Sequence, residues 1–465
     1  MNDRRGEVMF AGIVVILFLV GVAFDVGSTE VRPGSGTSID SSTFRARSTF
    51  CPGAISAPAA DLDVVVAAPF DDPVTVRIEP HEDAPVEVPS SGGVLYDVGN
   101  GEPTDVVGYG GVVSAHVLTT TERPGAGAGA GACAGAADDT WYFAAGSASL
   151  HVDERILLYN PFPDEAVVRI VLFTPKGEMS KASLADIPVP SRTFTVVELN
   201  KAVQVEEGRR LALQVRAERG RVVAWRQMFV ADEDRPTGMQ LSLGAPQPAV
   251  AWHFPEGAVG GGAVERISIL NPSEEEAVVA ITLAVDRAKV LSPPDLMEVA
   301  VPPRSQTNVR VGDHVKTGDE PVAVSATVRS INEVRVVAER EVSYDSDAGV
   351  GVAAELGATV ESERWIAPPA AATAAEDALS ILNPSTDEAR VSLRLLGLDG
   401  IERATPGLVD PEIGPGGRVR IPLARWTGGD VVLAFVESNV PVVVERFAFE
   451  RASRDVASLM GVPLP

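Results

Sequence analysis

A tryptophan followed by an apolar stretch that ends in Asn-Pro occurs three times in this chain. The three copies are Trp141 with Asn160-Pro161, Trp252 with Asn271-Pro272, and Trp365 with Asn383-Pro384. The step from Trp to Asn is 19, 19 and 18 residues, and the copies recur every 111 to 113 residues. A period of that length predicts tandem modules, each with its own core, and not a short-repeat solenoid.

Each copy carries three further marks in the same order. An alternating strand follows Asn-Pro, a Pro-centred turn leads into a second strand, and a strongly apolar strand then ends in Arg226, Arg340 or Arg446. Alternation with period two is typical of half-buried strands. The 43 Gly and 35 Pro residues favour short strands joined by turns over long helices. The pattern predicts an all-β chain of tandem immunoglobulin-like β-sandwich modules.

The length of 465 residues allows roughly three or four domains. The repeat places modules at 141–248, 249–361 and 362–465, and a divergent first module at 51–140. In that first module, residues 64–69 stand for the strand that ends in Asn-Pro, and Thr121-Glu122-Arg123 stands for the strand that ends in Arg. Its run of alternating Gly and Ala at 125–132 is interpreted as a flexible loop or a low-complexity insertion.

The N-terminus carries the only long apolar run. Residues 8–24 hold no charge, Arg4 and Arg5 precede them, and a polar stretch at 25–50 follows. Two readings stay open for residues 1–24: a cytoplasmic stub with an uncleaved transmembrane anchor, or a cleaved secretory signal. The basic flank predicts that everything after the segment lies outside the cytoplasm, with 25–50 as a flexible stalk.

The two cysteines agree with export. Cys51 and Cys133 form no CxxC motif and no Cys/His cluster. In an oxidising compartment the expectation for a lone pair is a disulfide. The alternative is two free thiols.

The net charge of −25 argues against nucleic acid as a partner, because phosphate binding needs a basic face. The expected partners are the membrane through residues 8–24, and a cell-wall polymer or an envelope protein outside it.

No catalytic signature stands out in the sequence, and its five histidines are scattered singly. We therefore expect no catalytic residues, no cofactor and no metal ligands. The acidic loops Asp232-Glu233-Asp234 and Asp345-Ser346-Asp347 leave calcium binding as an alternative to solvated charge.

Two repeated features have competing interpretations. The repeated Trp fits a core residue, with a carbohydrate-stacking platform as the alternative. The pairs Glu339-Arg340 and Glu445-Arg446 fit cross-strand or inter-module ion pairs, with binding of an acidic ligand as the alternative, because neighbouring strand residues face opposite sides.

The Cys-Pro-Gly at 51–53, Cys133 just before Trp141, the strands ending in Asn-Pro and the Val-Val-x-Glu-Arg strand ends resemble a family of exported actinobacterial proteins classed only as a domain of unknown function. The resemblance carries over no catalytic residue, since its motifs are structural.

These features predict a non-enzymatic cell-envelope protein, membrane-anchored or secreted, with modules for structural or binding roles. The alternative is a glycan-processing envelope enzyme or its accessory subunit, motivated by the repeated Trp and the many acidic residues.

Overall fold

The computed structural model describes residues 47–52, 60–70, 72–80, 84–99, 103–109, 114–121, 127–203, 210–231, 237–346 and 349–465. The predicted membrane or signal segment at 8–24, the predicted stalk up to residue 46 and the acidic loop at 232–234 lie outside these residues. Among the residues that are described, no helix is both long and apolar enough to cross a membrane. The described part is all-β, and every pairing between its strands is antiparallel.

The second module shows the plan that the others follow. One sheet has the order β14-β10-β16-β17 and the other the order β12-β11-β15-β9, with β13 added beside β11. Its elements are β9 (Thr140–Phe143), β10 (Val152–Asn160), β11 (Ala166–Thr174), β12 (Gly177–Met179), η1 (Ala182–Leu184), β13 (Ile187–Val189), β14 (Thr193–Glu198), α2 (Leu199–Ala202), β15 (Ala212–Arg219), β16 (Val223–Val230) and β17 (Gly238–Leu243).

The third module repeats this plan with the sheets β24-β20-β27-β28 and β18-β26-β21-β22. Its elements are β18 (Ala251–Phe254), β19 (Ala258–Val259), β20 (Ala263–Asn271), β21 (Ala277–Ala284), β22 (Val290–Leu291), η2 (Pro294–Leu296), β23 (Val299–Val301), β24 (Ser305–Arg310), η3 (Val311–Asp313), β25 (Val322–Ala323), β26 (Ser325–Ser330), β27 (Val337–Asp345) and β28 (Val350–Leu356).

In the fourth module one long strand, β35, serves both sheets. Its first half pairs with β29 and β31, and its second half pairs with β30 and β36. The elements are β29 (Ser362–Ala367), β30 (Ala374–Leu382), β31 (Ala389–Gly397), β32 (Glu402–Arg403), β33 (Glu412–Ile413), β34 (Arg418–Pro422), α3 (Ala424–Thr427), β35 (Val432–Glu450), β36 (Val456–Met460) and β37 (Val462–Pro463). The two faces share one apolar core, in which Leu379 and Ile381 of β30 pack with Val391 and Leu393 of β31.

The first module has the sheets β1-β6-β3-β4 and β5-β2-β7-β8. Its strands are β1 (Arg47–Cys51), β2 (Ala60–Ala67), β3 (Val74–Glu79), β4 (Val86–Val88), β5 (Gly93–Asp97), β6 (Thr104–Tyr109), β7 (Ser114–Thr121) and β8 (Gly127–Ala132).

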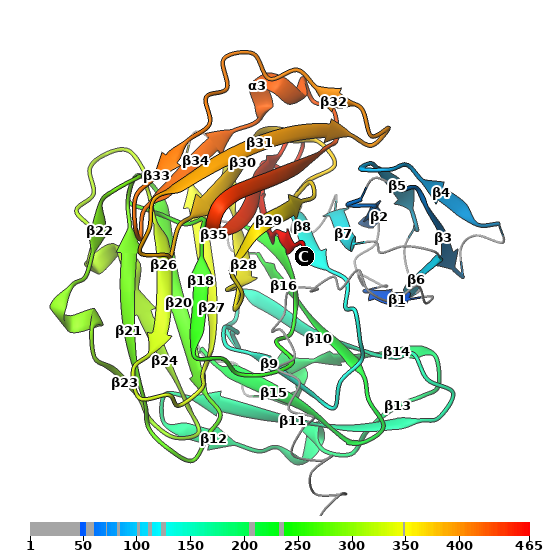
Figure 1. Cartoon of the computed structure of the whole chain (residues 1–465). Helices are drawn as coiled ribbons and strands as arrows, with labels where there is room; N and C mark the ends of the chain where they lie inside the picture. The colour runs from blue at the N-terminus through cyan, green and yellow to red at the C-terminus, as the bar shows by residue number, and fades with distance from the viewer. Residues whose placement is uncertain are drawn as a thin grey trace, which may run out of the picture. The chain divides into compact units, whose positions relative to one another are not determined.

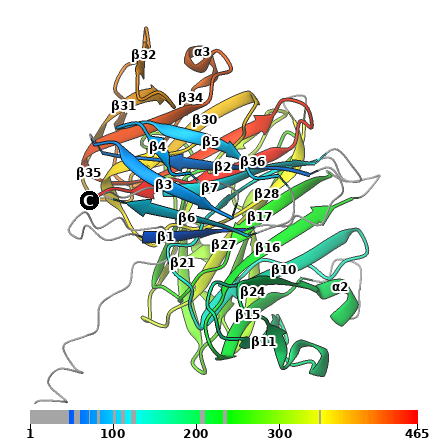
Figure 2. The ribbon, with the colours of Figure 1, turned by 90° about the vertical axis from the view of Figure 1, so that its right-hand side faces the viewer.

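Each module has a terminal strand, which is β8, β17, β28 or β36, and this strand contacts the terminal strand of the following module. β8 contacts β17, β17 contacts β28, β28 contacts β36, and β36 contacts β8, so these four terminal strands form a closed cycle. Figure 1 shows the four modules around these strands, and Figure 2 shows the first module (blue) between the fourth (orange and red) and the second (green). The modules therefore share their interfaces and belong to one compact unit, where the sequence had suggested separate modules in a row.

The interpretation of the Gly-Ala run as a loop is wrong for its described part. Residues 127–132 form β8, which pairs with β7 and lies in the central cycle. A Cβ atom added at Gly131 would lie 3.0 Å from Cγ of Leu241 in β17. Alternating Gly and Ala let the strand approach its neighbours closely, a reason for glycine that composition alone does not reveal.

The strand register also decides how the divergent first module aligns with the others. Val117 lies opposite Val64 and Gly131, just as Arg226 lies opposite Ile156 and Ser242. The alignment of residues 64–69 with the Asn-Pro strands is therefore confirmed. The alignment of Thr121-Glu122-Arg123 with the strand that ends in Arg is wrong, because the register puts His116-Val117 at those positions.

The predicted disulfide between Cys51 and Cys133 is present, and both residues are fully buried. Phe50 bridges Ala134 as Tyr142 bridges Ala245, so Cys51 and Cys133 correspond to Phe143 and Gly244 of the second module. There, a Cβ atom at Gly244 would lie 2.9 Å from Cζ of Phe143. A covalent bond in the first module thus joins the two positions that a phenyl ring and a glycine fill in the second.

Replacing both cysteines by alanine should destabilise the protein by up to about 4.5 kcal/mol, because the unfolded chain loses a closed loop of about 83 residues. Chemical denaturation measures this loss. A reductant should destabilise the wild type by a similar amount and leave the Cys51→Ala/Cys133→Ala variant unaffected. Equal stability of variant and wild type would contradict a stabilising bond.

Candidate functional site

The three repeated tryptophans lie in the module cores. Trp141, Trp252 and Trp365 are at most 3% exposed. Each indole N–H donates at 2.8–2.9 Å to the backbone carbonyl four residues before the repeated Arg, which belongs to Val222, Val336 and Val442 respectively. The rings therefore hold the first strand of each module in place and offer no face for stacking on a sugar.

The repeated asparagines close the turn that follows their strands. Asn271 is fully buried, and its side-chain amide donates to the carbonyls of Glu275 and Val301 while its Oδ1 accepts from the backbone N–H of Ser273. Asn160 and Asn383 make the same three kinds of contact. The adjacent Pro161, Pro272 and Pro384 follow directly after these asparagines, where the missing N–H suits a turn.

The repeated arginines reach across module interfaces. Arg226 of the second module pairs with Glu339 of the third, and Arg340 of the third pairs with Glu445 of the fourth. All four side chains are 0% exposed. The Nη1 atoms of Arg226 and Arg340 donate to the carboxylates at 3.1 and 3.0 Å, and the Nη2 atoms complete bidentate pairs.

The two interfaces share more than the ion pair. Glu339 accepts the N–H of Ala145 at 2.8 Å, and Glu445 accepts the N–H of Glu256 at 3.0 Å. Gln306 donates to the carbonyl of Ala144, as Arg418 donates to that of Pro255. At both interfaces, the equivalent backbone loop of one module is therefore bound by two equivalent strands of the next module.

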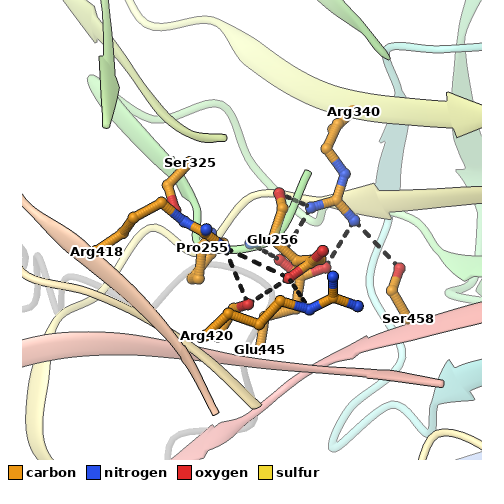
Figure 3. A network of polar contacts seen from close by, with 9 residues as sticks. Pro255, Glu256, Ser325, Arg340, Arg418, Arg420, Glu445 and Ser458 are labelled. Carbon is orange, nitrogen blue, oxygen red and sulfur yellow. Dashed lines mark hydrogen bonds and ion pairs between the residues drawn. The ribbon is translucent and has the colours of Figure 1, made fainter. Parts of the chain in front are cut away.

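The interface between the third and fourth modules adds a second buried acid, Glu256 (Figure 3). Its carboxylate accepts a hydrogen bond from Ser380 and lies 3.5 Å from Arg418 Nη2 and 3.8 Å from Arg420 Nε. Burial by itself would raise the pKa of Glu256, but Arg420, Arg418, Ser380 and Arg340 together lower it below its usual value. These charges neutralise one another inside the protein, which fits a structural role.

The series of ion pairs has two distinct ends. At its start, Trp225 stands where the next modules have Glu, and its indole donates to the carbonyl of Ala132 in the first module. At its end, Arg446 pairs with Asp377 of its own module through Nε at 2.9 Å and through Nη2. The strand register puts His116 of the first module at the position that Glu holds in the third and fourth modules.

Two further buried acids face the repeated arginines from the Asn-Pro strands. Burial raises the pKa of Glu154 to about 7 and that of Glu265 to about 8, although Arg226 and Arg340 act in the opposite direction. Neither carboxyl oxygen of Glu265 has a hydrogen-bond partner among the described residues. This environment favours the neutral acid.

The described residues contain no group of three or more His, Cys, Asp or Glu side chains that could hold a metal ion. The acidic loop at 345–347 is described only as far as Ser346. Two cavities of about 140 and 160 Å³ lie beside Thr327 and beside Arg446, and both are smaller than an ordinary ligand pocket.

Sequence reasoning missed Glu256, Arg418 and Asp455, the last of which lies at the centre of the terminal strands. Glu256 stands where the second module has Ala145, so the residue type is not repeated between modules and the repeat does not single it out. Asp455 could have been found by comparing residues at fixed distance before Gly244, Gly357 and Gly461.

A model for a family of unknown function, DUF5719, matches residues 105–316. A search of curated proteins gave no match. The matched range begins within the first module and ends within the third, so it contains Arg226 but stops before its partner Glu339.

Replacing Glu445 by alanine should destabilise the protein by about 3–5 kcal/mol, because it leaves Arg340 buried without its partner. The double variant Arg340→Met/Glu445→Leu should lose less stability than Glu445→Ala, since neither charge of the pair stays buried without its partner. Chemical denaturation measures both, with the exposed Arg219→Ala as control. A single variant as stable as the double one would contradict the pair.

The stability of the protein should depend on pH through Glu265. Its pKa is about 8 in the folded state against 4.5 ordinarily. Its contribution to the free energy of unfolding is therefore full below pH 4.5 and is lost as pH rises through 8. The free energy of unfolding of the Glu265→Gln variant should therefore rise relative to that of the wild type by up to about 1.4 kcal/mol per pH unit across that window. Denaturation at pH 5, 6, 7 and 8 measures the difference, and Glu363→Gln on the surface is the control. Parallel pH profiles would refute the assignment.

Proposed function

We propose that this protein is a non-enzymatic cell-envelope protein, membrane-anchored or secreted, whose four modules act together as one extracytoplasmic body. The observation that carries the proposal is the buried Cys51–Cys133 disulfide, which belongs to the core of the first module. Such bonds persist in oxidising compartments and are rare in the cytosol. The apolar residues 8–24 and the basic Arg4 and Arg5 supply a route of export.

The interfaces between the modules support a structural or binding role for the body as a whole. Buried ion pairs join the second to the third module and the third to the fourth. Apolar clusters join the first module to the second and to the fourth. A body whose modules are joined by buried contacts holds its loops in defined positions, which reduces the entropy lost when a partner binds.

We treat the modules as variants of the immunoglobulin-like sandwich. In that fold the first strand pairs with the second, whereas here β9 lies beside β15 and β16 takes the place beside β10. The exchange brings the terminal strand β17 to the centre of the cycle.

The charge of −25 favours a neutral or basic partner, such as a neutral wall glycan or an envelope protein, over a phosphate-rich polymer. The alternative of a glycan-processing enzyme was motivated by the repeated tryptophans and by the many acidic residues. The burial of the tryptophans in the described cores removes the first of these two motivations.

The topology is tested by adding protease to intact, wall-stripped cells. We expect all four modules to be accessible, because no second apolar run in the sequence returns the chain. Protection of the modules in intact cells, with cleavage after lysis, would overturn the proposal.

N-terminal sequencing then separates the two forms. An anchored protein begins at or near Met1 and stays with membranes after a high-salt wash, whereas a cleaved one begins near Phe24 or Thr29 and enters the medium.

A further inference from the structure

Four equivalent backbone positions meet where the terminal strands begin. In each module, a residue of the first strand bridges the residue just past the terminal strand: Ala134, Ala245, Ala358 or Val462. Seven residues before these stand Gly127, Gly238, Gly351 and Asp455. Three of the four positions carry no side chain, and the fourth carries a carboxylate.

That carboxylate accepts one backbone N–H from every module. Oδ2 of Asp455 accepts from Ala128 at 3.0 Å and from Met239 at 2.8 Å. Oδ1 accepts from Val352 at 3.0 Å and from Val456 at 2.8 Å. The side chain is 1% exposed. Each oxygen receives two donors, which is the number of its in-plane lone pairs, so the ionised group is fully hydrogen-bonded.

The three glycines make the room for this group. A Cβ atom at Gly127 would lie 2.7 Å from Oδ2 of Asp455, and Cβ atoms at Gly238 and Gly351 would come closer still. Any side chain at these positions would displace the carboxylate. A single carboxylate therefore fits at the centre only because the other three equivalent positions are glycine.

We infer that the centre of the four terminal strands is a carboxylate-binding site, built from one backbone N–H of each module and occupied by the chain's own Asp455. Converging N–H groups form a site for anions, and hydrogen bonds to an ionised acceptor are roughly twice as strong as neutral ones. Beyond its Cα atom, aspartate is an acetate group, so the site takes a small planar carboxylate of that size.

The inference predicts that external carboxylates replace the missing side chain. Asp455→Gly removes the whole acetate group and should bind acetate. Asp455→Ala keeps the methyl carbon and should bind the shorter formate but not acetate. A ligand that binds only the folded state stabilises it in proportion to the logarithm of its concentration above Kd.

The experiment is thermal unfolding of the full-length variants at pH 9, above the pKa of about 8 to which burial raises Asp455 in the wild type. Both variants should unfold at a lower temperature than the wild type. Acetate should raise the midpoint of Asp455→Gly, and formate that of Asp455→Ala, relative to sodium chloride at equal ionic strength. The wild type and the exposed Asp313→Gly variant serve as controls and should respond to neither acid.

Each outcome decides the question. Variants that unfold like the wild type, or that lose stability without a carboxylate-specific recovery, would overturn the inference. If a variant does not fold, the readout is its yield on refolding in the matching carboxylate against chloride, and equal yields overturn it. The result does not depend on where the protein resides, so it stands or falls separately from the proposed envelope role.

Discussion

The meeting of four terminal strands at the carboxylate of Asp455 is the constraint on which the rest of the structure depends. Four β-sheets approach one point only if the residues there are small, and β8 meets that need with alternating Gly and Ala. The carboxylate then satisfies one N–H from each strand, groups that would otherwise be buried without partners at a cost of about 1–3 kcal/mol each. Close packing and hydrogen bonding thus point to the same arrangement.

The dipeptide Glu-Arg connects successive modules because neighbouring residues of a strand face opposite sides of the sheet. Glu339 faces back to the second module, and Arg340 beside it reaches forward to the fourth. At each of these interfaces the earlier module supplies the Arg and the later module supplies the Glu. Buried pairs contribute little net stability but penalise a wrong partner strongly, which suits the ordering of four similar modules.

The first module contacts its neighbours through apolar and aromatic side chains, and the Tyr159 hydroxyl also donates to the Asp105 carboxylate across its interface with the second module. Phe50 packs against Tyr159, and the ring contacts continue through Phe194 to Trp225 at centroid distances of 5.2–6.1 Å. On its other side Val65 and Leu118 pack against Ile366 and other residues of the fourth module. The disulfide supplies the first module with a cross-link that the others do not have in their described parts.

The sequence by itself determined the all-β class, most of the strands and the disulfide, because these follow from local periodicity, turn residues and the number of cysteines. It also indicated that the Glu-Arg pairs form ion pairs, since alternation along a strand is a local rule. The tertiary structure alone decided which Glu each Arg meets, that residues 127–132 form a central strand, and that Asp455 lies among three glycines. These depend on contacts between residues more than 100 positions apart, where the spacing in the chain carries no information about the distance in space.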